Sequence, residues 1–134
     1  MKFSTLMISK AVVCLILGPL LVFVPGPFVS VFGLTLNAGG AMLAREYGAA
    51  LVGTLLLTWF ARNAAESDAR RAIILALFVY DAIGFVVTLL VRLAGVLNPL
   101  GWSIPILYLF FTVGFGYYAI RGVPQRASTL SSHP

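Results

Sequence analysis

The segment AIILALFVYDAIGFVVTLLV, residues 72–91, decides the fold. Its only charged side chain is Asp81, and the remaining residues are apolar or weakly polar. A helix needs about 20 mainly apolar residues to cross the hydrocarbon core of a bilayer. We therefore predict a membrane-spanning helix over residues 69–93, with Ser67 as its N-cap and Asp68 in its first turn, where the helix dipole favours an acid.

The whole chain has the composition of a membrane protein. Of its 134 residues 60% are hydrophobic and only 10% are charged, whereas soluble domains are about 25% charged. Nine Lys and Arg residues and four Asp and Glu residues separate apolar segments instead of forming one basic face. This distribution argues against a nucleic-acid partner. It predicts an all-α, integral membrane four-helix bundle over residues 1–122, in contact with the lipid bilayer.

Four spans fit between the charges. The first is kinked at Pro19 and ends at Pro25-Gly26-Pro27, because proline cannot continue the helical hydrogen bonds. We expect it to be retained in the protein, with a cleaved signal peptide as the alternative. The predicted spans are residues 6–24, 38–62, 69–93 and 104–120, followed by a short, polar, disordered cytoplasmic tail over residues 123–134.

The second span is the least apolar of the four. The uncharged stretch from Tyr47 to Ala61 has 15 residues, which reach only about 22 Å as a helix. To cross a bilayer the helix has to begin near Ala38, with Asn37 as its N-cap. Arg45 and Glu46 then enter the membrane.

The basic residues also predict an orientation. With the N-terminus in the cytoplasm, seven Lys and Arg residues lie on the inner side and only Arg45 and Arg92 on the outer side. Basic residues favour the cytoplasmic side of a membrane. We expect a multi-pass protein of the bacterial inner membrane with both termini in the cytoplasm.

Asp81 is the strongest candidate for a functional residue. Buried acids in membrane helices usually face the interior of the bundle. Tyr108 and Thr112 are expected at a similar depth and are candidates to hydrogen-bond its carboxylate. Lys10 is a better candidate cation than Arg45, although neither is expected to be well placed for a direct bond. The residue is interpreted either as a proton or substrate site or as a structural contact between helices.

Arg45 and Glu46 form a second polar feature near the outer leaflet. Adjacent helical residues point about 100° apart, so each needs another partner. One interpretation is contact with an anion or a lipid headgroup. The other is an extended side chain that reaches the headgroups, together with one salt bridge between helices.

Small residues recur at four-residue spacing in the second span, at Gly40, Ala44 and Gly48, and Ala49 and Gly53 repeat the spacing on a neighbouring stripe. Small residues let helices approach closely in lipid. We predict that they pack helices, either within the bundle or between two copies of the chain.

The sequence offers no recognisable chemistry. Cys14 is a lone cysteine within an apolar segment, the predicted spans contain no histidine, and the serines and threonines lack a base partner. No catalytic residue, metal site or cofactor is therefore expected.

The chain resembles small, uncharacterised four-helix membrane proteins of bacteria that are grouped loosely with DoxX-like proteins. The resemblance rests on the hydropathy of residues 6–120, on Ala44-Arg45-Glu46-Tyr47-Gly48 at the start of the second span, and on Trp59-Phe60-Ala61-Arg62-Asn63 at its end. It implies a fold and a location, and no shared activity.

Three functions remain open. The first is a non-enzymatic bundle that associates with itself, with a membrane protein partner or with lipid. The second is a small transporter or proton-linked permease subunit that uses Asp81. The third is a membrane enzyme acting on a lipid or a quinone.

Overall fold

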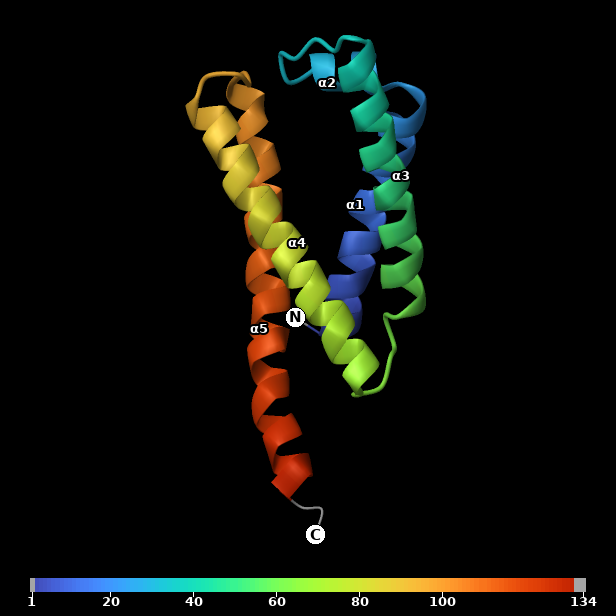
Figure 1. The fold of residues 1–134 in the computed structure, drawn as a ribbon, viewed down its shortest axis with the longest axis vertical. Coiled ribbons are helices and arrows are strands. Elements are labelled where there is room, and N and C mark those ends of the chain that lie inside the picture. The colour runs from blue at the N-terminus through green and yellow to red at the C-terminus, as the bar shows by residue number, and fades with distance from the viewer. Residues whose placement is uncertain (1, 132–134) are drawn as a thin grey trace.

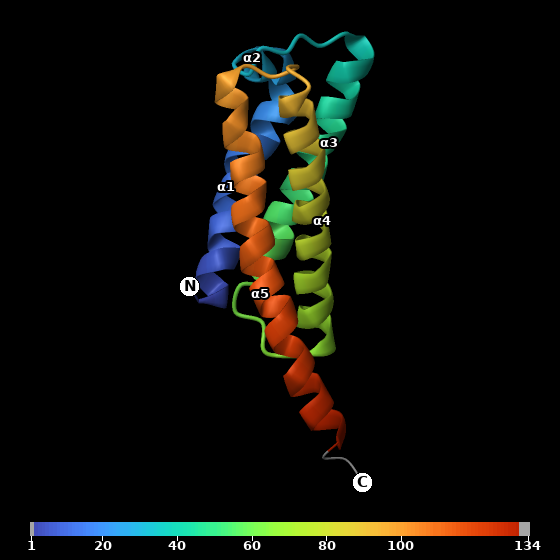
Figure 2. The same ribbon diagram turned by 90° about the vertical axis from the view of Figure 1, so that its left-hand side faces the viewer.

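The structure is a computed structural model that describes residues 2–131, with side chains described through Arg121. It is all-helical over that range, as predicted, and contains no strand there (Figures 1 and 2). Its elements are α1 (Phe3–Phe23), α2 (Pro25–Ser30), α3 (Ala38–Phe60), α4 (Asp68–Leu93), the 3-10 helix η1 (Pro99–Trp102) and α5 (Ser103–Ser131).

Three segments within the described residues are long and apolar enough to cross a membrane: Phe3–Phe23, Asp68–Leu93 and Pro99–Arg121. Helix α3 is also long, with 23 residues, but it is not among these three segments. Arg45 and Glu46 lie in its first half and lower its mean hydropathy. The second span is thus the exceptional one in the structure, as it is in the sequence.

Local sequence signals set where the helices begin. The side chain of Asn37 accepts a hydrogen bond from the Gly40 amide at 2.7 Å, and the Ser67 hydroxyl accepts one from the Arg70 amide at 3.2 Å. Both N-caps are therefore confirmed. Each satisfies an amide that the first turn of a helix leaves without an internal partner.

One predicted boundary is wrong, because α5 does not end near residue 120 but continues to Ser131. The predicted tail is thus helical over residues 123–131, and residues 132–134 lie outside the described part of the chain. Helix α5 continues through Pro124, because a proline inside a helix removes one hydrogen bond but does not always end the helix. Helix α1 likewise continues through Pro19.

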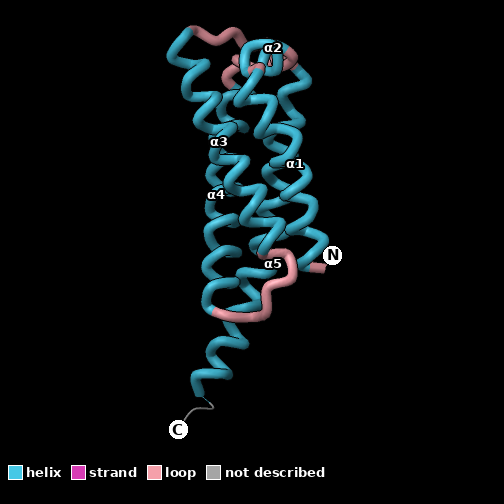
Figure 3. The backbone as a smooth tube through the Cα atoms, turned by 90° about the vertical axis from the view of Figure 1, so that its right-hand side faces the viewer, coloured by secondary structure: helices cyan, strands magenta, loops and turns pink. Residues whose placement is uncertain are grey.

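The four long helices of the described chain form two pairs. Helices α1 and α3 pack along each other as the first pair, and α4 and α5 pack along each other as the second pair. Figure 1 shows the pairs splayed apart at the end that carries α2 and converging toward the opposite end. Figure 3 shows the connecting loops gathered at these two ends.

Two apolar clusters hold this arrangement. One cluster joins the first pair to the second near the N-terminal end of α1, and consists of Leu6, Met7, Leu77, Phe111 and Phe115. The other lies between α1 and α3 and contains Cys14, Leu21 and Leu51. The first cluster is therefore the apolar contact that connects the two pairs, and it leaves the α2 end between them without a filled core.

Candidate functional site

A buried ion pair connects the two helical pairs at mid-height. Lys10 of α1 donates to Oδ1 of Asp81 on α4 at 2.5 Å. Their side chains are 4% and 0% exposed. The prediction that Lys10 is poorly placed for a direct bond is therefore wrong, whereas its preference over Arg45 is correct. The reason is that α4 crosses obliquely toward α1 (Figure 1) and the flexible lysine stem covers the remaining distance.

Aromatic rings surround the Lys10 ammonium. Its nitrogen lies 4.6 Å from the ring centroid of Phe111, 5.0 Å from that of Tyr80 and 5.8 Å from that of Tyr108. A cation within about 6 Å of an aromatic face is attracted by the ring quadrupole. The rings therefore stabilise the ammonium in a place that is 3% exposed.

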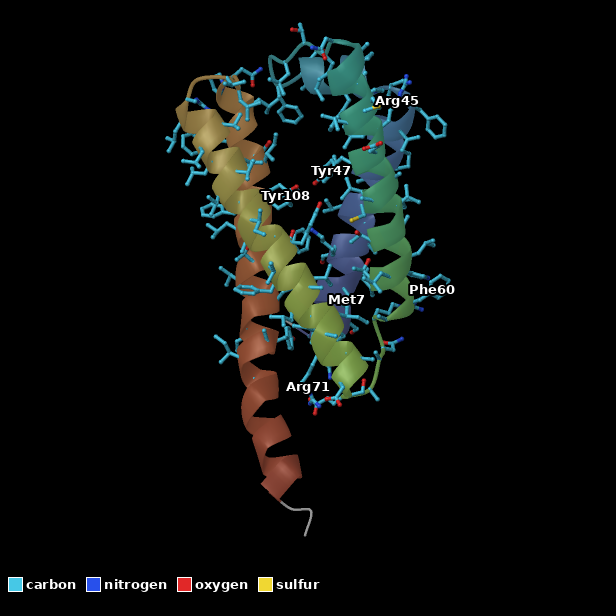
Figure 4. The ribbon with its side chains drawn as sticks, in the orientation of Figure 1. Met7, Arg45, Tyr47, Phe60, Arg71 and Tyr108 are labelled. Carbon is cyan, nitrogen blue, oxygen red and sulfur yellow. The ribbon has the colours of Figure 1, made fainter. Side chains whose placement is uncertain are left out.

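Three tyrosine hydroxyls meet beside the ion pair, and we call Tyr47, Tyr80 and Tyr108 the tyrosine trio. Tyr80 donates to the Tyr47 oxygen at 2.7 Å, and the hydroxyls of Tyr47 and Tyr108 are also hydrogen-bonded to each other. Figure 4 shows Tyr47 and Tyr108 pointing toward each other from opposite helical pairs. The trio is thus a polar bridge from α3 to α4 and α5.

Gly84 makes the position of Tyr108 possible. A Cβ atom at Gly84 would lie 2.8 Å from Tyr108 Cζ, which is closer than real Cβ contacts. The absence of a side chain at Gly84 of α4 therefore leaves the space in which the Tyr108 ring lies.

The predicted hydrogen bonds from Tyr108 and Thr112 to Asp81 are not formed. Tyr108 bonds to Tyr47, and Thr112 donates to the Tyr108 carbonyl at 2.7 Å. Threonine in a helix commonly bonds to the carbonyl four residues earlier. Asp81 Oδ1 accepts from Lys10, and Oδ2 has no hydrogen-bond partner among the described residues.

A cavity of about 500 Å³ lies between the two helical pairs, on the α2 side of the ion pair. Its wall is mostly apolar, and the polar side chains on it are Lys10, Tyr47, Tyr108 and Ser103. Asp81 does not line it. The apolar lining residues are Val13, Cys14, Leu17, Leu21, Phe28, Val29, Phe32, Leu34, Ala44, Leu51, Ile104, Leu107 and Phe111.

Phe28 and Val29 of α2, together with Phe32 and Leu34 of the loop after it, form part of the cavity wall. A pair of hydrogen bonds, which we call the end clamp, holds that loop. The Asn98 side chain donates to the Val31 carbonyl at 2.9 Å, and the Asn98 amide donates to the Phe32 carbonyl at 3.0 Å. Gly33 has a φ of 82°, which favours glycine, and lies against Asn98. The end clamp therefore ties the loop after α2 to the loop after α4.

Arg45 and Glu46 do not take part in this site. Both are exposed on α3, and Arg45 points away from the second pair (Figure 4). The predicted salt bridge between helices is absent, because neither residue forms an ion pair within the described part of the chain. They border a separate shallow depression on α3.

The small residues of α3 do not act as one stripe. Gly48 packs against α1, where an added Cβ would lie 2.8 Å from the Gly18 carbonyl oxygen. Ala44 lines the cavity, and Gly40 contacts the residues that precede α3. Gly53 has no neighbour within 4 Å of an added Cβ. Helix packing is therefore shown for Gly48 and not for Gly53.

The residues that sequence reasoning missed are Tyr47, Tyr80 and Asn98. A signal for the tyrosines existed, since a phenolic hydroxyl in an apolar helix needs a hydrogen-bond partner. Asn98 forms long-range bonds to the loop after α2, and these bonds have no local signal in the sequence.

Neither a search for metal-binding groups among the described residues nor comparison with known proteins adds a further site. Within the described residues no group of three or more His, Cys, Asp or Glu side chains could hold a metal ion. Comparison with protein-family models, with curated proteins and with solved structures finds no match to this chain, so the resemblance to DoxX-like proteins stays a prediction.

Proposed function

We propose that this chain is a multi-pass membrane protein that binds an apolar, lipid-like molecule in the cavity between its two helical pairs. The cavity is the observation that supports this proposal. Its volume of about 500 Å³ falls in the range of small-molecule sites, about 300–1,000 Å³, which are mainly apolar with a few placed polar groups. Binding is proposed rather than catalysis because the polar side chains on its wall are few and the charge of Lys10 is already balanced by Asp81.

Membrane insertion is supported by the outer surface. Large apolar side chains are exposed on every long helix, including Leu15, Phe60, Leu90 and Val113. Soluble monomers rarely expose continuous apolar surface of this extent. We propose that α3 is the fourth crossing, with Arg45 and Glu46 near one membrane surface, and that both termini lie in the cytoplasm of a bacterial cell, as the basic residues favour.

The test uses a photoactivatable alkane, a hydrocarbon with a diazirine group, added to the purified chain in liposomes. We expect labelling of cavity residues that saturates with probe concentration, beside non-saturating labelling of bilayer-facing residues. Leu107 lines the cavity, and Leu109 on the same helix is 43% exposed. Leu107→Trp should abolish the saturable labelling, and the matched Leu109→Trp should retain it. Equal saturable labelling in both variants would contradict the proposal.

A proton-linked transporter is the second candidate, and the buried Lys10–Asp81 pair is the observation that favours it. Asp81→Asn distinguishes the two functions. If the chain only binds a lipid-like molecule, Asp81→Asn keeps saturable labelling by the alkane, and the proton-dependent flux into liposomes is the same for the variant and the wild-type chain. Loss of such a flux with labelling intact would favour the transporter.

A further inference from the structure

We propose that the cavity selects an apolar molecule whose polar end is an uncharged carbonyl oxygen, as in an ester or a ketone. This inference rests on the proposed function, because it concerns what the same cavity recognises. The three observations that carry it are the hydrogen count of the tyrosine trio, the free donors of Lys10 and the net charge of the buried pair.

The tyrosine trio has one hydroxyl proton more than the two hydrogen bonds to Tyr47 use. Tyr80 donates to Tyr47, so the Tyr80 proton is used in that bond. The bond between Tyr47 and Tyr108 runs in one of two directions. If Tyr47 donates, the Tyr108 proton remains, and if Tyr108 donates, the Tyr47 proton remains. Both residues line the cavity. In either case the remaining donor belongs to a tyrosine on the cavity wall. Where the remaining proton lies on Tyr108, the Tyr80 hydroxyl is a further acceptor near it, and a ligand oxygen takes the place of Tyr80.

Lys10 adds donors at the same wall. An ammonium carries three protons, and one of them is given to Asp81 Oδ1. Lys10 lines the cavity, and its other described neighbours are the aromatic rings, which are weak acceptors. The part of the cavity wall formed by Lys10, Tyr47 and Tyr108, which we call the floor, is therefore rich in hydrogen-bond donors. A ligand that fits it supplies an acceptor.

The charge of the floor decides which acceptor. Lys10 and Asp81 sum to zero charge whether the proton lies on the amine or on the carboxyl group. A carboxylate or phosphate would bring an uncompensated negative charge into an apolar site, which is costly. An alcohol would bring a proton of its own, which has to compete for tyrosine oxygens that already accept hydrogen bonds within the trio. A carbonyl oxygen accepts two hydrogen bonds and brings neither charge nor proton, so it matches the floor.

The experiment measures competition against the photoactivatable alkane at alkaline pH. The three competitors, methyl palmitate, palmitate and hexadecane, share a sixteen-carbon chain and differ in the polar end. We expect methyl palmitate to displace the probe at a concentration about five- to tenfold lower than hexadecane, the effect of one net hydrogen bond. Palmitate should compete least well. Equal competition by all three, or strongest competition by palmitate, would overturn the inference.

Variants of the tyrosine trio locate the donor. Tyr47→Phe and Tyr108→Phe should each keep the preference for methyl palmitate, because the tyrosine that remains on the cavity wall still has a proton to donate. The double variant should lose the tyrosine contribution to the preference while retaining saturable labelling by the alkane, which also shows that it folds. Tyr117→Phe on the same helix, outside the cavity and 50% exposed, is the control. A double variant with the full preference would contradict the assignment of the donor.

The outcomes separate this inference from the proposed function. Absence of saturable labelling by any probe in the wild-type chain overturns the proposed function and the inference with it. Saturable labelling without preference for the ester overturns the inference alone. If the double variant does not fold, the competitor series on the wild-type chain still decides the charge argument.

Discussion

Removing Lys10 tests the energetic role of the buried ion pair. Lys10→Met keeps an unbranched apolar stem but leaves the Asp81 carboxylate, which is 0% exposed, without its partner. Oδ2 already has no hydrogen-bond partner among the described residues, so the substitution leaves both oxygens without one. Breaking a buried pair on one side costs about 3–5 kcal/mol, whereas replacing both charges by apolar groups of similar volume is often neutral.

The assay is a double-mutant cycle of unfolding in mixed detergent micelles. We expect Lys10→Met to lower the free energy of unfolding by about 3–5 kcal/mol and the double variant Lys10→Met/Asp81→Leu to recover most of that loss. Lys2→Met is the matched control, because Lys2 is exposed at the start of the same helix. A loss below about 1 kcal/mol for Lys10→Met, or a double variant as unstable as the single one, refutes the reasoning.

Three further predictions concern the packing of Gly48, the end clamp and the orientation in the membrane. Gly48→Ala forces a Cβ against the Gly18 carbonyl at 2.8 Å and should lower stability by about 1–3 kcal/mol in the same unfolding assay, whereas Gly53→Ala meets open space and should leave stability unchanged or slightly raised. Asn98→Ala removes the side-chain bond to Val31 of the end clamp and should speed amide hydrogen exchange in the loop after α2; unchanged exchange there would mean that the clamp does not hold the loop. A reporter fused to either end of the chain should be active only in the cytoplasm, and periplasmic activity at either end would reverse the proposed orientation.

Part of the fold follows from the sequence because its causes are local. Asn37 and Ser67 each bond to an amide three residues away, so their positions predict where α3 and α4 begin. Likewise, Pro25 cannot continue α1 and occupies the first turn of α2 instead. The extent of α5 could not be predicted in this way, because residues 121–131 contain no signal strong enough to decide between a helix and an extended tail.

The candidate site shows where local reasoning ends. The sequence identified Asp81, because a carboxylate in a long apolar segment needs a partner whatever the packing is. It did not pair Lys10 with that carboxylate, because their contact depends on the crossing of α4 over α1. Estimating the depth of a residue in the membrane by counting along the chain assumes that the helices are parallel. It also assigned Tyr108 to Asp81 and not to Tyr47, because hydroxyl partners are chosen by distance in space.

The segment at residues 72–91 determined by itself that the chain has a long apolar helix with one acid in its middle, because length, hydropathy and charge are properties of a single helix. Tertiary structure alone decided that the helices form two splayed pairs, that Lys10 neutralises Asp81, and that a cavity lies between the pairs. These features depend on crossing angles and on contacts between residues as far apart as 71 positions, for which no local pattern carries information.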